Sequence, residues 1–302
     1  MAALAVVIGK LLALVAVGVA LRASGLLSPE DARPINSVII YAGLPALIFQ
    51  AVHPAPLGWE LAVVAAVAWV VALLGLALGY AASRLLRLSR PAAGALMLTS
   101  ALGNTGYIGY PVALGLLGSS GLVKAVFYDV FGTVGVLLTV GIAVAASFGA
   151  SDERPRLLRE LASFPAVIAL VLALALKPVA VPVVVSDWLD LLARLVVPLI
   201  MISLGLSLRL HALGRNAVPV AAVAAVKLLL LPLAALALGR VVLAGDPSAV
   251  RLVVLQAGMP TMLLSLVFGE RFHLDRDLIA SAAIVTTAAA IVSLPLAQAL
   301  VR

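Results

Sequence analysis

The chain has 302 residues, of which 64% are hydrophobic and 11% are charged, and its mean hydropathy is +1.24. A soluble domain of this size needs about a quarter of its residues charged, so the composition predicts an integral membrane protein. A membrane-spanning helix takes about 20 apolar residues, which leaves room for about ten spans and none for a soluble catalytic domain. The net charge of +7 comes from basic residues scattered singly between apolar runs. This pattern is typical of membrane topology signals and excludes nucleic acid as a partner.

Cysteine and histidine usage narrows the chemistry further. The chain has no cysteine, and its three histidines (His53, His211 and His273) lie far apart. Disulfides, thiolate metal sites and cysteine nucleophiles are therefore excluded, and we predict no metal and no cofactor. Lys10 interrupts the first apolar run and no basic segment precedes it, so this run is interpreted as a first helix rather than a signal peptide.

Charged residues and Pro/Gly clusters divide the chain into ten candidate spans with short connections. In chain order they cover residues 3–21, 34–52, 59–83, 92–118, 122–148, 161–178, 188–209, 217–243, 249–270 and 276–300. The most polar connection, 149–160, follows the fifth span. We therefore predict an all-α membrane protein with a five-helix repeat at 1–148, a cytoplasmic linker at 149–160 and a second five-helix repeat at 161–302.

The distribution of Lys and Arg predicts the orientation of these spans. The odd-numbered loops carry 12 of these residues, the even-numbered loops and the termini carry 5, and three more lie inside spans. Because positive charge collects in cytoplasmic loops, we expect the odd-numbered loops inside and both termini outside the cytoplasm. The protein is expected in the inner (plasma) membrane.

Two of the predicted spans are broken near their middles. Span 4 contains Gly-Asn-Thr-Gly-Tyr-Ile-Gly-Tyr-Pro at 103–111, and span 9 contains Gln-Ala-Gly-Met-Pro-Thr at 256–261. Glycine and proline at this density make a poor continuous helix. Five spans per half is an odd number, so the two halves must insert in opposite orientations, as in the inverted repeats of secondary transporters. Gly75 and Gly79 in span 3 are predicted to form a face for close helix packing.

The 103–111 segment resembles the span-4 signature of bacterial members of the auxin efflux carrier family, within the bile-acid/auxin/arsenite-type transporter superfamily. The segments 25–28, 44–49 and 275–295 are also similar, so the resemblance covers essentially the whole chain. It implies two inverted five-helix repeats, crossed broken helices 4 and 9, a scaffold subdomain and a mobile transport subdomain. It also implies carboxylate substrates, such as auxin, malate or malonate. Plant auxin carriers have Pro-Asn at the span-4 crossing; Gly103-Asn104 stands there in this chain.

The resemblance and the two breaks together select the candidate substrate-binding residues. They are Gly103, Asn104, Thr105, Gly106, Tyr107, Tyr110, Pro111, Pro260 and Thr261. Unwound backbone at membrane depth is tolerated where it lines a cavity or is buried in protein. Helix capping is the alternative role for Asn104 and Thr105, and helix–helix packing is the alternative for the two tyrosines.

Two charged residues lie deep inside predicted spans. Asp129 is about seven residues, or roughly 10 Å, inside the outer boundary of span 5, and Lys227 is about ten residues, or roughly 15 Å, inside the inner boundary of span 8. Such charges are costly and usually face a cavity or a partner. We assign Lys227 to substrate binding and Asp129 to coupling, with Lys227 paired to Asp129 when substrate is absent. A fixed structural ion pair is the alternative.

The sequence thus predicts a secondary transporter or facilitative carrier for small organic anions that works by alternating access, and not an enzyme. The alternative is a sodium-coupled bile-acid-type symporter, although its candidate ligands Asn36, Gln50, Gln256 and Glu270 are scattered. An intramembrane enzyme would need paired carboxylates or a nucleophile with its base, and a receptor would not need two broken helices. The expected partners are the anion and membrane lipid; coupling to H⁺ or Na⁺ and homodimer formation stay open.

Overall fold

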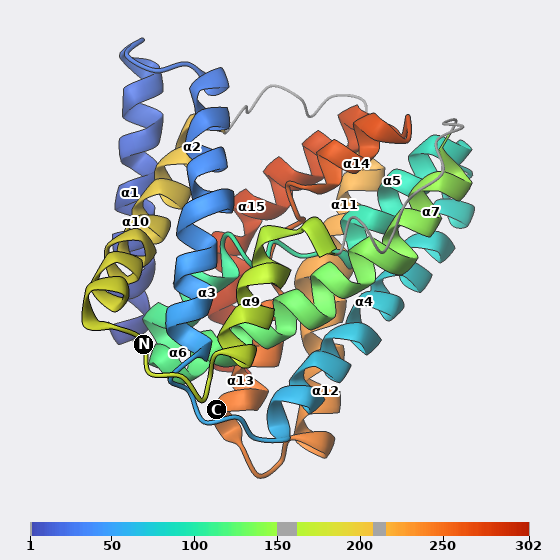
Figure 1. Ribbon diagram of the computed structural model, residues 1–302. Coiled ribbons are helices and arrows are strands. Elements are labelled where there is room, and N and C mark those ends of the chain that lie inside the picture. The colour runs from blue at the N-terminus through green and yellow to red at the C-terminus, as the bar shows by residue number, and fades with distance from the viewer. Residues whose placement is uncertain (1, 150–161, 208–215, 302) are drawn as a thin grey trace. The chain divides into compact units, whose positions relative to one another are not determined.

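The computed structural model describes residues 2–149, 162–207 and 216–301, and within these ranges the chain is helical apart from one isolated β-bridge (Figure 1). The predicted linker at 149–160 lies, except for Gly149, outside the described residues. The chain forms two compact units, and each unit takes segments from both halves of the sequence. Unit 1 contains residues 1–57, 110–123 and 159–208, and unit 2 contains residues 58–109, 124–158 and 209–302.

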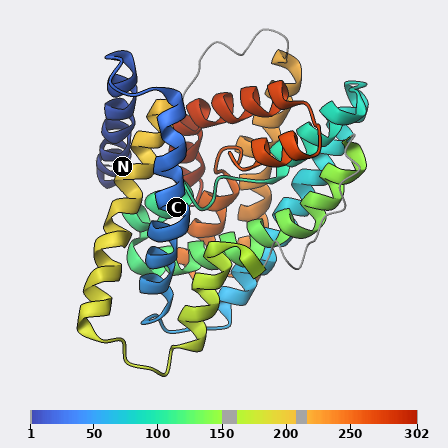
Figure 2. The ribbon, with the colours of Figure 1, turned by 45° about the horizontal axis from the view of Figure 1, so that its top comes forward.

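Unit 1 is built around the long helix α10. Gly18 of α1 and Gly205 of α10 face each other, and a Cβ at Gly18 would collide with the carbonyl oxygen of Ile202. Small residues at such a contact let two helix backbones approach closely in a membrane, and the two helices lie side by side in Figure 2. The helices of this unit are α1 (Ala2–Ala23), η1 (Pro29–Asp31), α2 (Ala32–Val38), η2 (Ile39–Gly43), α3 (Leu44–Val52), α9 (Pro165–Ala175) and α10 (Val183–Ser207).

Unit 2 contains both breaks and three of the helices that flank them, α5, α13 and α14. Its helices are α4 (Glu60–Leu85), α5 (Arg90–Ala101), η3 (Tyr128–Val134), η4 (Leu137–Gly141), α7 (Ile142–Phe148), α11 (Ala217–Ala225), η5 (Val226–Leu230), α12 (Leu231–Val242), α13 (Pro247–Ala257), α14 (Ser265–Arg271) and α15 (Arg276–Ala299). Helix α6 (Gly109–Phe127) is kinked at Gly118 and is divided between the two units.

The predicted glycine packing face in span 3 is confirmed. A Cβ at Gly75 would lie 2.7 Å from the Cα of Ala101, and a Cβ at Gly79 would lie 2.8 Å from the Cα of Met97. Helix α4 therefore packs backbone to backbone against α5, which leads directly into the first break.

Six helices in the described ranges are long and apolar enough to cross a membrane, and α9 and α13 are shorter apolar helices. The chain is therefore a multi-pass membrane protein. Four segments, η2 to η5, are π-helical. Single π-helical turns inside longer helices frequently occur at functional sites, and here η3 contains Asp129 and η5 contains Lys227.

Candidate functional site

The two broken helices meet at their unwound segments inside unit 2. The first break covers residues 102–108, between α5 and α6, and the second covers residues 258–264, between α13 and α14. Gly103 and Thr261 form an antiparallel bridge between them. The backbone N–H of Asn104 donates to the Pro260 carbonyl at 2.7 Å. Each break thus satisfies backbone groups of the other, which unwound backbone at membrane depth requires.

Both breaks are slightly displaced from the segments that the motifs predicted. Helix α6 already begins at Gly109, so Tyr110 and Pro111 lie in its first turn rather than in the break. Proline is tolerated there because the N–H it lacks would have no intrahelical partner. Helix α13 continues to Ala257, which places Gln256 in its last turn.

Threonine side chains hold the second break in place. The hydroxyl of Thr261 donates to the Thr99 carbonyl at 2.9 Å, and the Thr261 N–H donates to the hydroxyl of Thr286 at 3.0 Å. The Thr286 hydroxyl donates in turn to the Ala282 carbonyl at 2.6 Å. All three threonines are completely buried, so this chain of hydrogen bonds fixes Pro260 and Thr261 against α5 and α15.

Lys227 lies against the end of α5. The residue is 2% exposed, and its ammonium donates to the carbonyl of Ala101, the last residue of that helix, at 3.2 Å. A helix C-terminus carries a partial negative charge, which explains how a lysine is tolerated at this depth. A Cβ at Gly103 would lie 3.0 Å from the Lys227 Nζ, so glycine at this position makes room for the ammonium.

Asp129 lies on the other side of the first break. Its side chain is 4% exposed, and its carboxylate accepts a 2.5 Å hydrogen bond from the hydroxyl of Thr105. A Cβ at Gly106 would lie 3.0 Å from the Asp129 Oδ2. The break therefore has an ammonium at the end of α5 and a carboxylate just before the start of α6.

The expected pairing of Lys227 with Asp129 is wrong in this structure. Among the described residues Lys227 forms no ion pair, and its hydrogen bond goes to a carbonyl. The physical reason is that the two charges occupy different ends of the break. Each is stabilised locally, by a helix terminus or a hydroxyl, and not by the other charge.

Several buried polar atoms at the crossing have no hydrogen-bond partner. The Asn104 side chain is 3% exposed and its Nδ2 is unpaired; Gln256 is fully buried, and its Oε1 is unpaired. The other end of that amide, the Gln256 Nε2, donates to the Thr105 carbonyl at 3.3 Å. Buried unpaired amide groups cost about 1–3 kcal/mol each. A donor and an acceptor left unpaired at one crossing are therefore consistent with a ligand that supplies the missing bonds.

The structure brings together most of the predicted site residues. Gly103, Asn104, Thr105, Gly106, Pro260, Thr261, Lys227 and Asp129 meet within unit 2. Tyr107 lies in the first break and is partly buried. Tyr110 and Pro111 belong to unit 1, so their part in the site stays a prediction.

Sequence reasoning missed Thr99 and Thr286 as members of the site, and it named Gln256 only as one of several scattered candidate sodium ligands. For Gln256 the available signal was its position just before the second break, and in the structure its side chain lies against Gly109, the first residue of α6. A Cβ at Gly109 would collide with the Gln256 side chain. The described residues contain no cluster of three or more His, Cys, Asp or Glu residues that would bind a metal.

Several apolar helices and two broken helices crossing at buried polar side chains define a membrane transport protein. Residues 4–297 match the sequence model of the family described as membrane transport protein, and the chain belongs to this auxin efflux carrier family. It is 32% identical to an uncharacterized transporter of Methanothermobacter thermautotrophicus, over 95% of both chains. It is also 32% identical to an uncharacterized transporter of Methanocaldococcus jannaschii, over 91% of this chain and 92% of the relative. A protein of Rhizobium meliloti named "Putative malonate transporter" is 27% identical, over 84% of this chain and 82% of its own length.

Proposed function

We propose that this protein is a secondary transporter or facilitative carrier that moves small organic anions across the membrane by alternating access, with the crossing in unit 2 as the binding site. The observation that carries the proposal is Lys227, a residue that is 2% exposed and whose ammonium has, among the described residues, a carbonyl as its partner instead of a carboxylate. A buried cation without a counter-ion is costly. An anionic substrate would supply that counter-ion.

The unpaired Asn104 amide supports a carboxylate as the bound group. Its Nδ2 is a donor without an acceptor, and a carboxylate is an acceptor that can bind an amide and an ammonium together. The name of the R. meliloti relative refers to malonate, which carries two carboxylates. We therefore infer that the substrate class is short mono- or dicarboxylic acids.

The positions of the helix boundaries support two inverted five-helix repeats, at 1–148 and 161–302. Helix α4 covers Glu60–Leu85, and the continuous helix from α11 to α12 covers Ala217–Val242, so both boundaries recur 157 residues later. The same shift relates Asn104 to Thr261 and the start of α5 to the start of α13. We infer that the second half repeats the first in the opposite orientation.

The two compact units support alternating access. This mechanism needs one body that carries the substrate and one that stays fixed. Both breaks, Lys227 and Asp129 belong to unit 2, whereas α1, α3 and α10 belong to unit 1. We propose unit 2 as the mobile transport body and unit 1 as the scaffold.

The proposed orientation in the inner membrane, with both termini outside, follows from the charge bias of the loops. Because the chain lacks cysteine, a single cysteine introduced at Ser151 or Ala299 is the only thiol that a maleimide can label in that variant. A membrane-impermeant maleimide should reach Ser151→Cys from the cytoplasm and Ala299→Cys from outside. Labelling of both from the same side would contradict the ten-span arrangement.

Flux measurements in proteoliposomes test the anion proposal. Purified protein should take up radiolabelled malonate or another member of a panel of mono- and dicarboxylates, and thermal shift should rank the same panel. Asn104→Leu and Thr261→Leu should abolish uptake while the protein still inserts and elutes as a single species. Normal uptake by Asn104→Leu would show that the crossing is not the site.

A specific observation favours sodium coupling as a second candidate function. The unpaired Gln256 Oε1, the Asp129 carboxylate and the Thr105 carbonyl all lie at the first break, and such oxygens suit a hard cation. In that case uptake would depend on an inward Na⁺ gradient and persist without a pH gradient. Uptake driven by a pH gradient in Na⁺-free buffer would instead assign coupling to H⁺, with Asp129 as the proton carrier.

A further inference from the structure

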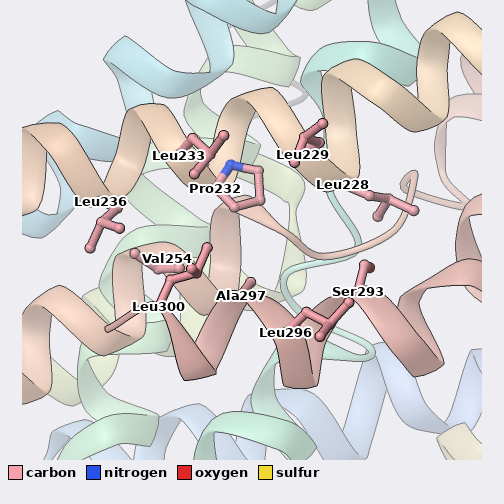
Figure 3. A pocket seen from close by; sticks show the side chains of 10 residues that line it. All are labelled: Leu228, Leu229, Pro232, Leu233, Leu236, Val254, Ser293, Leu296, Ala297 and Leu300. Carbon is pink, nitrogen blue, oxygen red and sulfur yellow. The ribbon is translucent and has the colours of Figure 1, made fainter. Parts of the chain in front are cut away.

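An apolar cavity of about 220 Å³ lies in unit 2, and none of its lining residues belongs to either break. Figure 3 shows side chains from two helices that run in the same direction bordering it, Leu228 to Leu236 on one and Ser293 to Leu300 on the other, with Val254 between them. The lining residues are Leu228, Leu229, Pro232, Leu233, Leu236, Val254, Ser293, Leu296, Ala297 and Leu300. Leu229 and Leu296 are 56% and 63% exposed, so the cavity opens on the apolar surface of the protein.

Water is a poor occupant of this cavity. A volume of this size corresponds to about seven waters at roughly 30 Å³ each, and each buried water needs two to four polar partners. The only side-chain polar atom in the lining is the hydroxyl of Ser293. An occupant that is itself apolar fits better, and in a membrane this is the acyl chain of a lipid.

An apolar lining alone gives no selectivity in a bilayer, because lipid tails are as apolar as leucine. Selectivity for one kind of lipid can come from two arginines near one end of this cavity. Arg240 follows the lining residue Leu236 by one turn of α12, and Arg251 precedes Val254 by one turn of α13. The short loop 243–246 joins α12 to α13, so both arginines lie near the same end of unit 2.

Both arginines are exposed, so their guanidinium groups are accessible to an anionic ligand. Arg240 donates to the Leu300 carbonyl at 3.2 Å, which ties it to the rim of the cavity. Within the described ranges neither guanidinium is joined to a carboxylate. The acidic residue of the loop, Asp246, is already neutralised by Lys124 at 3.0 Å.

We propose that this cavity and the Arg240–Arg251 pair form a binding site for one anionic phospholipid. An acyl chain occupies the groove between α12 and α15, and the phosphate of the headgroup lies between the two guanidinium groups. Arginine is well suited to this contact because its planar fork binds phosphate oxygens in pairs. The charge of the headgroup provides the selectivity, and the cavity provides the place for one chain.

Native mass spectrometry of the detergent-purified protein tests the proposal with two probes, phosphatidylglycerol and phosphatidylcholine of identical chain length. Each basic residue near an anionic lipid contributes about a five-fold preference, so the wild-type protein should retain phosphatidylglycerol at least ten-fold better. The double variant Arg240→Gln/Arg251→Gln should bring the two lipids close to parity. Arg240→Lys/Arg251→Lys should retain most of the preference, and Arg84→Gln, an exposed arginine on α4, should change nothing.

Filling the cavity tests the place of the acyl chain separately. Ala297→Leu should lower the retention of both lipids several-fold, whereas Ala299→Leu, two residues further on and outside the lining, should not. Equal retention of the two lipids by the wild-type protein would overturn the headgroup assignment. Unchanged retention in Ala297→Leu would overturn the cavity assignment. A different outcome is a dimer that retains no lipid and whose interface includes Leu233 or Leu296. That result would show that a second copy of the chain, and not a lipid, covers this surface.

Discussion

The two breaks cross each other, but only the first is charged. The first break has the Lys227 ammonium at the end of α5 and the Asp129 carboxylate on Thr105. With the 157-residue shift, Asp129 corresponds to Thr286, which binds the Thr261 N–H of the second break, and Lys227 corresponds to Val70, which is 49% exposed. The neutral break is closed by threonines whose hydrogen bonds are satisfied.

This difference assigns separate roles to the two breaks. Burying a charge costs several kcal/mol even after relaxation. The second break is held in place by hydrogen bonds from uncharged threonines, so charges are not needed to fix an unwound segment at this depth. The charges at the first break therefore point to ligand contact and coupling. The second break has a structural role, because it holds the first break in position. Variants made at corresponding positions of the two breaks test this division directly.

The largest effect is expected from Lys227→Met, which keeps the length of the side chain and removes its charge. A hydrogen bond to a charged group is worth about 1.5–3 kcal/mol, so the affinity for the anion should fall about 10- to 100-fold. Val70→Met at the corresponding position should leave affinity unchanged. Isothermal titration with the best acid from the panel measures both variants, and equal affinities in the two would remove Lys227 from the site.

Asp129→Asn is expected to change coupling rather than binding. The amide is nearly isosteric with the carboxylate and still accepts the Thr105 hydrogen bond, but it cannot take up and release a proton as a carboxylate can. Counterflow exchange of substrate should persist while accumulation driven by a pH gradient is lost. Thr286→Val, at the corresponding position of the second break, should lower thermal stability by about 1 kcal/mol and leave coupling intact. Accumulation by Asp129→Asn that still follows the pH gradient would contradict the assignment.

Substitutions of Gly103 in the first break, Gly109 beside it and Gly9 far from it should rank by what each new side chain meets. A Cβ at Gly109 would collide with the Gln256 side chain, and forcing extra volume into a packed site costs about 1–3 kcal/mol. The methyl group of Gly103→Ala would meet the flexible end of Lys227 at 3.0 Å and make an ordinary contact with the methyl group of Thr105 at 3.4 Å, so it should weaken anion affinity with little loss of stability. Gly9→Ala on α1 has open space around the new methyl group, and in a helix it should be neutral or slightly stabilising. Melting temperature and affinity, measured together, separate the three.

Much of this arrangement could be predicted from local sequence. Glycine and proline density located both breaks to within a few residues, because the cost of these residues in a helix is a property of the backbone alone. The chain alone did not reveal which side chains from distant helices meet the breaks. Gln256 and Thr286 reach them only through packing, and Lys227 and Asp129 differ by 98 positions, so their separate binding to two helix ends was not visible before the fold was known.

The smallest effect concerns how the two half-helices begin. Asp246 is the N-cap of helix α13; its carboxylate accepts from the Ala249 N–H at 3.0 Å and pairs with Lys124. The corresponding N-cap of α5, Ser89, makes no side-chain capping bond. Burial by itself would raise the pKa of Asp246, but the hydrogen bonds from Ala249 and Lys124 and the charge of Lys124 outweigh it and hold the pKa below its ordinary 3.8.

A carboxylate with a lowered pKa stabilises the folded state at pH values above its unfolded pKa, and this contribution disappears as the pH falls through the lowered value. Stability due to Asp246 should therefore be constant from neutral pH down to about 4 and be lost only below that. Asp246→Ala should cost about 1 kcal/mol at neutral pH, the usual value of a helix N-cap. Asp246→Asn should cost less because asparagine still caps the helix, and Ser89→Ala should cost almost nothing. Thermal unfolding in detergent at pH 7 and pH 3.5 measures the series. An Asp246→Asn variant that loses as much stability as Asp246→Ala would show that the ion pair to Lys124, not the cap, fixes the start of α13.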